Sequence, residues 1–378
     1  SRRCVHMDSG LSFVVGTGLR QRHRSLKSAE TNHCARARPV SKCSLYSRTL
    51  RSCGNHPRMS NADSEILKDS DLIFKSNCGT WTWRGFHINY KVDGDTSSSR
   101  KCLLIHGFGG SVFSWRNNTQ PLANAGFCVF SIDLLGFGDS DKPIEVEYNL
   151  ELWEELVVDF IGFVDSRFST ESTPEWILAG NSVGSLVALM SSVKLLELGK
   201  LVKGITLFNC AGGLTSFRYE ELPPLGAAAF WLFKKILFND FIGPIFFEKF
   251  RTRENIRSVL SQIYFNPDAI DDQLVDALYK PSEHPNASYV FLKILNAPAG
   301  PTPKSLLDVL GDRVPILAVW GESDPWTPLR RGIHRGELFP SWNSKVQLSI
   351  IEGAGHCPMD DRPEAANAIM LDWIQTLS

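Results

Sequence analysis

The chain alternates between short apolar runs and longer segments whose apolar residues recur at helical spacing. Glycine or polar turns separate the two kinds of segment, and residues 150–168 are a clear example of the helical pattern. The apolar runs cover residues 102–106, 128–133, 175–181, 204–208, 316–320 and 347–351. Alternation of this kind predicts an α/β fold with a mostly parallel, doubly wound sheet. We expect the functional site at the carboxyl ends of the strands.

A different pattern precedes the first of these runs. Residues 81–83 and 88–92 alternate in polarity and are separated by a turn that contains Arg84 and Gly85. Two such runs around a short turn predict an antiparallel hairpin that opens the sheet.

The alternation fails between about residues 211 and 310, where helical patterns occur without a convincing strand. We therefore expect an inserted helical cap at 211–310, between core segments at 66–210 and 311–378. Five aromatic residues of the cap are candidates for binding an apolar substrate: Phe230, Trp231, Phe233, Phe246 and Phe247. The alternative is that these rings form the cap's own core and its contact with the main domain. Charges at Lys234, Lys235 and Asp240 interrupt the aromatic run, which suits a helix lying on a membrane surface better than one that spans it.

The N-terminal 65 residues have a composition unlike that of the rest of the chain. Their first sixty positions hold ten Arg and two Lys against only Asp8 and Glu30, and they are rich in serine. This composition predicts an organellar transit peptide, whereas the short apolar run at 11–19 favours the alternative of a secretory signal. Without these sixty residues the chain has about eleven more acidic than basic residues, which argues against a nucleic-acid partner.

Cysteines and histidines give no metal-binding pattern. The five cysteines after residue 65 are scattered and form no Cys-x-x-Cys pair, and no two histidines have the spacing of metal ligands. We therefore expect neither a metal nor a cofactor.

The segment 180–184, of sequence GNSVG, follows an apolar run and precedes a second apolar segment. A serine at a sharp turn from a buried strand into a helix is typical of the nucleophile elbow of the α/β-hydrolase fold. So tight a turn leaves no room for side chains two residues before and after the serine, and Gly180 and Gly184 meet that need. We expect Ser182 to be the nucleophile.

A serine nucleophile needs a base, and the base needs a group that fixes it. Asp324 and His356 follow the apolar runs at 316–320 and 347–351, in the order Ser, Asp, His that this fold uses. They are the expected orienting acid and general base.

The reaction also needs hydrogen-bond donors for the oxyanion that forms when the serine attacks a carbonyl. The expected donors are the backbone N–H groups of Val183, directly after the nucleophile, and of Phe108, in the glycine-rich loop after the strand at 102–106. We expect His106 to orient this loop by hydrogen bonding and Asp139 to act at most as a structural brace.

Several longer strings, taken together, resemble one family. They are LIHGFGGS at 104–111, DLLGFG at 133–138, GNSVGS at 180–185, FNCAGG at 208–213, REN at 253–255, GHCP at 355–358 and DDRP at 360–363. From Trp81 onward the chain resembles the plastid α/β-hydrolases that include chlorophyll dephytylase and pheophytinase. Ser185 stands where pheophytinase-like proteins usually carry a glycine, so the elbow looks closer to the dephytylase.

The resemblance implies a chloroplast enzyme, in the stroma or associated with the thylakoid, that hydrolyses the phytyl ester of chlorophyll or a related pigment. It assigns the same roles to Ser182, Asp324 and His356 as the residue pattern does. A serine at position 182 excludes the branch of the fold that uses an aspartate nucleophile. The alternatives are another plastid prenyl or acyl ester or lipid hydrolase, a carbon–carbon bond hydrolase, an acyltransferase, or a ligand receptor on the same fold.

Overall fold

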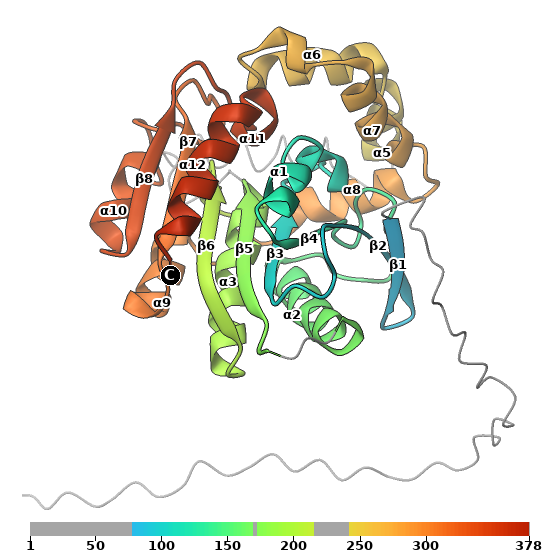
Figure 1. The fold of residues 1–378 in the computed structure, drawn as a ribbon. Coiled ribbons are helices and arrows are strands. Elements are labelled where there is room, and N and C mark those ends of the chain that lie inside the picture. Colours follow the sequence, from blue (N-terminus) through green and yellow to red (C-terminus); the bar gives the residue numbers. More distant parts are fainter. Residues whose placement is uncertain (1–77, 169–171, 215–241, 378) are drawn as a thin grey trace, which may run out of the picture. The chain divides into compact units, whose positions relative to one another are not determined.

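An eight-stranded sheet forms the centre of the computed structural model, which describes residues 78–168, 172–214 and 242–377 (Figure 1). The predicted transit segment 1–65 lies outside the described residues. The strands are β1 (Cys78–Trp83), β2 (Phe86–Asp93), β3 (Arg100–Ile105), β4 (Cys128–Ile132), β5 (Glu175–Asn181), β6 (Leu201–Phe208), β7 (Ile316–Gly321) and β8 (Val346–Ile351). Their order across the sheet is β1-β2-β4-β3-β5-β6-β7-β8.

The sheet is mostly parallel, as the pattern predicts. The pairs β1·β2 and β2·β4 are antiparallel, and the pairs that connect β4, β3, β5, β6, β7 and β8 are all parallel. At the hairpin between β1 and β2, Arg84 and Gly85 have φ of 52° and 88°. Positive φ at both central residues is what a tight two-residue hairpin turn requires.

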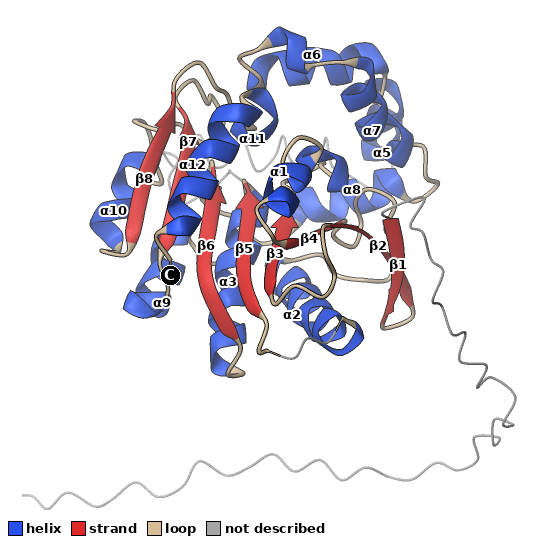
Figure 2. Ribbon diagram, viewed as in Figure 1, coloured by secondary structure: helices blue, strands red, loops and turns tan. Residues whose placement is uncertain are grey.

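Helices cover both faces of the sheet (Figure 2). The helices of the core are α1 (Thr119–Asn124), α2 (Leu150–Arg167), α3 (Val183–Glu197), α10 (Phe339–Trp342), α11 (Pro358–Asp361) and α12 (Pro363–Gln375), with short 3-10 turns η1 (Val112–Trp115) and η5 (Gly336–Leu338). Helices α2 and α3 pack on one face with Leu103 and Ile105, while α1 and α12 pack on the other with Cys102 and Leu104. The alternation of β3 side chains between two cores follows from the two-residue period of a strand.

Helices, without a strand among the described residues, connect β6 to β7. They are α5 (Ile242–Phe250), α6 (Arg253–Ile263), α7 (Asp272–Ser282), α8 (Ala287–Asn296) and α9 (Pro303–Leu310), with 3-10 turns η3 (Pro267–Ala269) and η4 (Gly311–Arg313). Polar N-caps define several of these starts: the side chains of Thr252, Asp271 and Thr302 accept backbone N–H groups at the beginnings of α6, α7 and α9. The inserted helical cap is therefore present, while the boundaries at 66, 211 and 311 stay predictions.

No helix within residues 78–168, 172–214 and 242–377 is both long and apolar enough to cross a bilayer.

Candidate active site

Ser182 lies at the sharp turn between β5 and α3, where the glycine pattern predicts it. Its φ is 54°, a left-handed value that a serine adopts only where its surroundings enforce it. The backbone N–H of Ser182 donates to the carbonyl of Phe208 at the end of β6, over 2.9 Å. A Cβ on Gly180 would lie 2.2 Å from the carbonyl oxygen of Gly184, and one on Gly184 would lie 2.3 Å from that of Ile105. Both glycines are therefore required by close backbone contacts.

Asp324 and His356 are in direct contact. Asp324 follows β7 and His356 follows β8, and Nδ1 of His356 lies 2.8 Å from Oδ2 of Asp324. Both side chains are buried, with 4% and 5% of the residue surface exposed. A buried carboxylate at this distance fixes the imidazole ring and favours a proton on Nδ1, which leaves Nε2 free to act as a base.

Further donors surround the carboxylate of Asp324. Its Oδ2 accepts hydrogen bonds from Nδ2 of Asn209, at 2.5 Å, and from the hydroxyl of Thr327. Its Oδ1 accepts the backbone N–H groups of Trp326, at 2.7 Å, and of Thr327, at 3.1 Å. Burial by itself raises the pKa of Asp324. The hydrogen bond to His356 and the charge of that ring oppose this effect, as do the hydrogen bonds from Thr327 and Asn209, and together they lower the pKa to about 2. The carboxylate is therefore ionised near neutral pH.

Asn209 is a site residue to which the sequence analysis assigned no role. It follows β6 with a φ of 44°, and its side-chain Oδ1 accepts the backbone N–H of Gly321 at 2.9 Å. Its amide thus connects the end of β7 with the carboxylate of Asp324. The available signal was a polar residue directly after a buried strand, a position at which this fold places functional groups.

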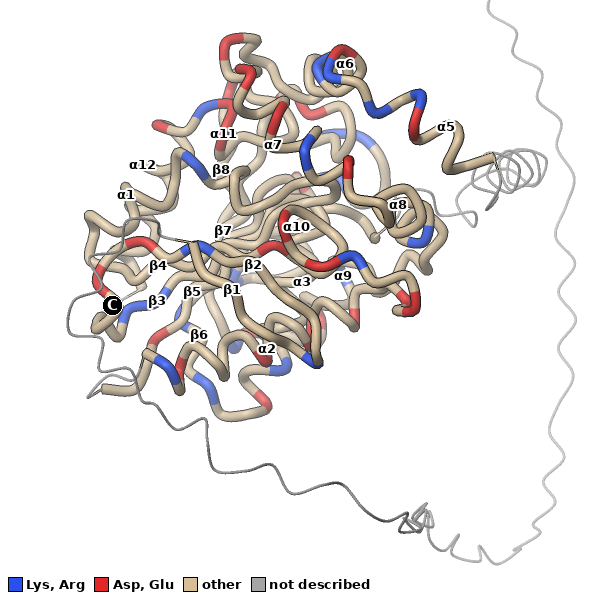
Figure 3. The backbone as a smooth tube through the Cα atoms, turned by 90° about the vertical axis from the view of Figure 1, so that its right-hand side faces the viewer, with Lys and Arg blue, Asp and Glu red and all other residues tan. Residues whose placement is uncertain are grey.

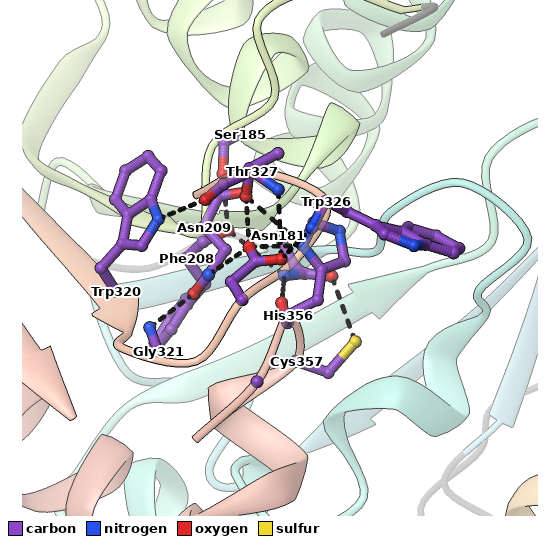
Figure 4. Close-up of polar contacts among 12 residues, drawn as sticks. Asn181, Ser185, Phe208, Asn209, Trp320, Gly321, Trp326, Thr327, His356 and Cys357 are labelled. Carbon is purple, nitrogen blue, oxygen red and sulfur yellow. Dashed lines mark hydrogen bonds and ion pairs between the residues drawn. The ribbon is translucent and has the colours of Figure 1, made fainter. Parts of the chain in front are cut away.

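Asn181 connects the elbow to the loop that carries His356. Its Nδ2 donates to the carbonyl oxygen of His356, at 3.0 Å, and to that of Phe208, at 3.2 Å (Figure 4). The residue beside Ser182 is therefore bonded to His356, so the structure places all three predicted residues at the same edge of the sheet. Cys357 is partly buried, and desolvation of its thiol raises the pKa and keeps the thiol protonated.

The loop that carries Phe108 is held by His106. Nδ1 of His106 lies 2.7 Å from the carbonyl oxygen of Gly107, and Nε2 accepts the backbone N–H of Leu134 at 3.1 Å. Burial lowers the pKa of His106 to about 4, so the ring is neutral with its proton on Nδ1. A Cβ on Gly107 would lie 3.1 Å from Cβ of Ser182, so this loop lies against the elbow. The use of the Phe108 and Val183 N–H groups as oxyanion donors stays a prediction.

Asp133 braces the same loop from the end of β4. Its carboxylate accepts the backbone N–H of Val112, at 2.6 Å, that of Asp139, at 2.8 Å, and Nδ2 of Asn89, at 2.8 Å. Burial raises the pKa of Asp133 to about 6 in spite of these hydrogen bonds. Asp139 takes part through its backbone.

A chain of aromatic contacts leads from the loop into the cap. Phe108 packs on Phe137 and on Phe291 of α8, with ring centroids 5.7 and 5.3 Å apart, and Phe291 packs on Phe247 of α5 at 5.2 Å. Phe246 is instead exposed (43%) and stacks on Phe250. Of the predicted substrate-binding aromatics, Phe247 thus has an aromatic connection to the loop, and Phe230, Trp231 and Phe233 lie outside the described residues. Phe291 was not among the predicted residues.

A surface cavity of about 740 Å³ lies between α6 and α7, away from Ser182. Charged residues line it, and Arg253 and Arg257 form ion pairs there with Asp276 and Asp272. Such a lining does not suit an apolar ester. Figure 3 shows acidic and basic residues interleaved along this part of the cap. Within the described part of the chain, no group of three or more His, Cys, Asp or Glu side chains could hold a metal ion.

Residues 102–369 match the Alpha/beta hydrolase family, and the chain belongs to that family. The fold predicted from the sequence is thereby confirmed, and the chain is a hydrolase.

Individual relatives are consistent with this assignment. The chloroplastic pheophytinase of Arabidopsis thaliana is 29% identical over 333 residues, which cover 77% of this chain and 64% of that protein. This similarity confirms the resemblance to the plastid hydrolases, whereas the preference for the dephytylase stays a prediction. The 2-hydroxymuconate semialdehyde hydrolase of Pseudomonas sp. (strain CF600) is 24% identical over 69% of this chain and 82% of its own.

Among solved structures, a membrane phospholipase A has a TM-score of 0.60 and 22% identity, covering 79% of this chain and 86% of its own. The epoxide hydrolase CorEH has a TM-score of 0.59 and 17% identity, covering 80% and 99% of the two chains. At these identities the two structures support the fold alone.

Proposed function

We propose that this chain hydrolyses a carboxylic ester with Ser182 as nucleophile, His356 as general base and Asp324 as the acid that orients it. The observation that carries the proposal is the contact of 2.8 Å between His356 and Asp324. The loop that carries His356 is in turn hydrogen-bonded to Asn181, the residue before Ser182. The low pKa of Asp324 supports it, because an ionised carboxylate stabilises the imidazolium that forms during the reaction.

The reaction begins when the hydroxyl oxygen of Ser182 attacks the ester carbonyl and its proton passes to Nε2 of His356. The resulting oxyanion accepts the backbone N–H groups of Phe108 and Val183. His356 then donates the proton to the leaving alcohol, and the acyl group stays on Ser182. Water, deprotonated by His356, attacks this acyl-enzyme. The bond between the acyl carbon and Ser182 then breaks, the proton passes from His356 to the oxygen of Ser182, and the acid is released.

The substrate that we propose is the phytyl ester of chlorophyll or of a related pigment, cleaved to chlorophyllide and phytol. The similarity to a chloroplastic pheophytinase supports this substrate and a location in the chloroplast, either in the stroma or at the thylakoid. The aromatic contacts among Phe108, Phe291 and Phe247 also support it, because a long prenyl chain needs an apolar surface beside the reacting carbonyl.

Contact of the cap with a membrane is a further part of the proposal. Four large apolar residues of α5 are exposed: Ile242 (47%), Ile245 (62%), Phe246 (43%) and Phe250 (47%). Exposed apolar residues gathered on one short helix suit insertion into the interface of a bilayer.

To test the proposed substrate, the purified chain is incubated with detergent-solubilised chlorophyll and pheophytin, and phytol release is measured. We expect phytol and the dephytylated pigment from the wild type and neither from Ser182→Ala. If the wild type hydrolyses a simple activated ester but releases no phytol, the pigment is excluded while the esterase mechanism is retained.

Carbon–carbon bond hydrolysis is the second candidate, because a 2-hydroxymuconate semialdehyde hydrolase is among the relatives. Product analysis separates the two reactions. An ester hydrolase releases an alcohol together with the acid, whereas a carbon–carbon hydrolase releases an acid and a product with a new C–H bond.

A further inference from the structure

The loop that carries His356 is bonded directly to the cap. The backbone N–H of His356 donates to the carbonyl oxygen of Ile263, the last residue of α6, over 2.7 Å. The carbonyl oxygen of His356 accepts Nδ2 of Asn181 from the elbow, over 3.0 Å. The backbone of the proposed base is thus fixed between the cap on one side and the elbow on the other.

Asp361 gives this contact its second part. It is 1% exposed, and its Oδ2 accepts the backbone N–H of Gly355 at 2.6 Å and that of Phe265 at 2.9 Å. Its Oδ1 accepts the backbone N–H of Asn266 at 2.8 Å. One carboxylate therefore joins the residue before His356 to two residues of the link between α6 and α7.

The approach of the two segments is very close. A Cβ on Gly355 would lie 2.0 Å from the carbonyl oxygen of Ile263, so only glycine fits there. Around His356 itself, Nε of Arg362 donates to the carbonyl oxygen of Gly353 over 2.8 Å. The cap link and the histidine loop therefore form one hydrogen-bonded unit.

We propose that Asp361 is a positioning residue that transmits the position of the cap to His356, so that the base is aligned with Ser182 and Asp324 only while the link at 263–266 is bonded to residues 355–361. This proposal rests on the proposed role of His356. It goes beyond that role by making the cap part of the machinery that sets the position of the base, in addition to a cover for the substrate.

The neighbouring Asp360 has a different environment. Its carboxylate accepts Nε of Arg116 at 2.8 Å and the hydroxyl of Tyr264 at 3.0 Å. Nη1 of Arg116 also donates to the carboxylate of Asp271 at the start of α7, over 2.7 Å. This second set of contacts holds the cap without touching Gly355 or His356, and it supplies a matched control.

The test compares Asp361→Asn with Asp271→Asn. In Asp361→Asn, either orientation of the amide leaves at least one of the three backbone N–H groups without its acceptor. Asp271 makes the ion pair with Arg116 and also caps α7, and an asparagine caps a helix equally well. Both variants replace a carboxylate with an amide on the same part of the molecule, but only the first removes an acceptor from the contacts between the cap link and the histidine loop.

Three readouts decide the outcome: kcat and KM for p-nitrophenyl acetate, the rate of labelling by a fluorophosphonate that reacts with activated serines, and the low-field NMR signal of the proton on Nδ1 of His356. In Asp361→Asn we expect kcat and the labelling rate to fall by about 10- to 100-fold, because small displacements of a base have large effects on rate, with little change in KM. We also expect the low-field signal to broaden or disappear. For Asp271→Asn we expect kcat, KM and the labelling rate to stay within about twofold of the wild-type values and the low-field signal to be retained, as expected for a partly exposed ion pair.

A folded Asp361→Asn with the kcat and the low-field signal of the wild type would overturn the proposal. If that variant does not fold, hydrogen exchange of the wild type decides the question. The amides of Gly355, His356, Phe265 and Asn266 should then exchange as one group, and independent exchange of the two segments would overturn the proposal. A wild type that does not react with the fluorophosphonate would contradict the proposed function instead, and the NMR signal and the exchange would still report on the alignment of His356.

Discussion

Nδ2 of Asn209 lies 2.5 Å from Oδ2 of Asp324, the same carboxylate oxygen that faces His356. The two residues are 115 positions apart and follow adjacent parallel strands, β6 and β7. The orientation of the carboxylate toward His356 therefore depends on an amide from the neighbouring strand.

We expect Asn209→Ala to lower kcat by about tenfold or more, because loss of a hydrogen-bond donor to a buried charged group costs about 1.5–3 kcal/mol. Asn209→Gly is the matched variant, because it also removes the amide but accepts the φ of 44°. A loss of kcat shared by both variants gives the contribution of the Asn209 amide to catalysis. A greater loss of thermal stability in the alanine variant gives the cost of the backbone strain at this φ. Wild-type kcat in the glycine variant would show that Asp324 does not need Asn209.

The exchange Ser182→Ala should lower kcat by about 10³- to 10⁶-fold, the range found when a member of a catalytic triad is removed. The measurement is hydrolysis of p-nitrophenyl acetate by the purified chain. Ser191→Ala is the control, since it makes the same chemical change at a buried position of α3, the helix that begins directly after Ser182. Retained turnover in Ser182→Ala would remove this residue from its proposed role.

Phe246 and Phe247 are neighbours on α5, and we expect different effects from them. Phe247→Ala should raise KM for long-chain esters several-fold and leave KM for an acetate nearly unchanged, because its ring contacts Phe291 and through it Phe108. Phe246→Ala removes an exposed ring and should instead weaken binding to lipid vesicles, measured by sedimentation. Equal KM effects from the two variants would contradict this division of roles within the cap.

Asp133 should make the stability of the fold depend on pH. Its pKa is about 6 in the folded protein, against the ordinary value of 3.8 that applies to the unfolded chain. Between these two pH values the folded chain therefore binds more protons than the unfolded chain does. The free energy of unfolding therefore falls as the pH rises from about 4 to about 6, by up to about 3 kcal/mol at about 1.4 kcal/mol for each unit of pKa.

Urea unfolding of the wild type and of Asp133→Asn at several pH values isolates this contribution. The difference between the two free energies should change across the window from pH 4 to 6 and be constant above it. A difference that does not depend on pH in this window would show that Asp133 is ionised in the folded protein at its ordinary pKa.

The sheet could be predicted closely because buried parallel strands appear as continuous apolar runs. The run at 128–133 became β4, and the run at 347–351 became most of β8. The elbow could be predicted equally well, since its two glycines are required by contacts within a few residues or with the adjacent strand β3. Local sterics and burial leave a direct trace in the sequence.

The remaining parts of the site depend on contacts between distant segments. The role of Asn209 exists only because β6 and β7 are adjacent, and the role of Asp361 exists only because the link between α6 and α7 lies against the histidine loop. Phe291 belongs to a helical pattern that predicts an apolar face, but the pattern does not predict that this face packs on Phe108. The spacing of residues along the chain does not predict which distant segments come into contact.

The absence of room for a side chain at Gly355 has a consequence for protein engineering. Exchanging the inserted cap for that of a relative is one way to seek a change in substrate preference. In this chain, a graft that replaced 211–310 alone would place a foreign α6–α7 link against the native residues 355–361. A graft that carries both segments together is therefore the one expected to keep a working base beneath a new cap.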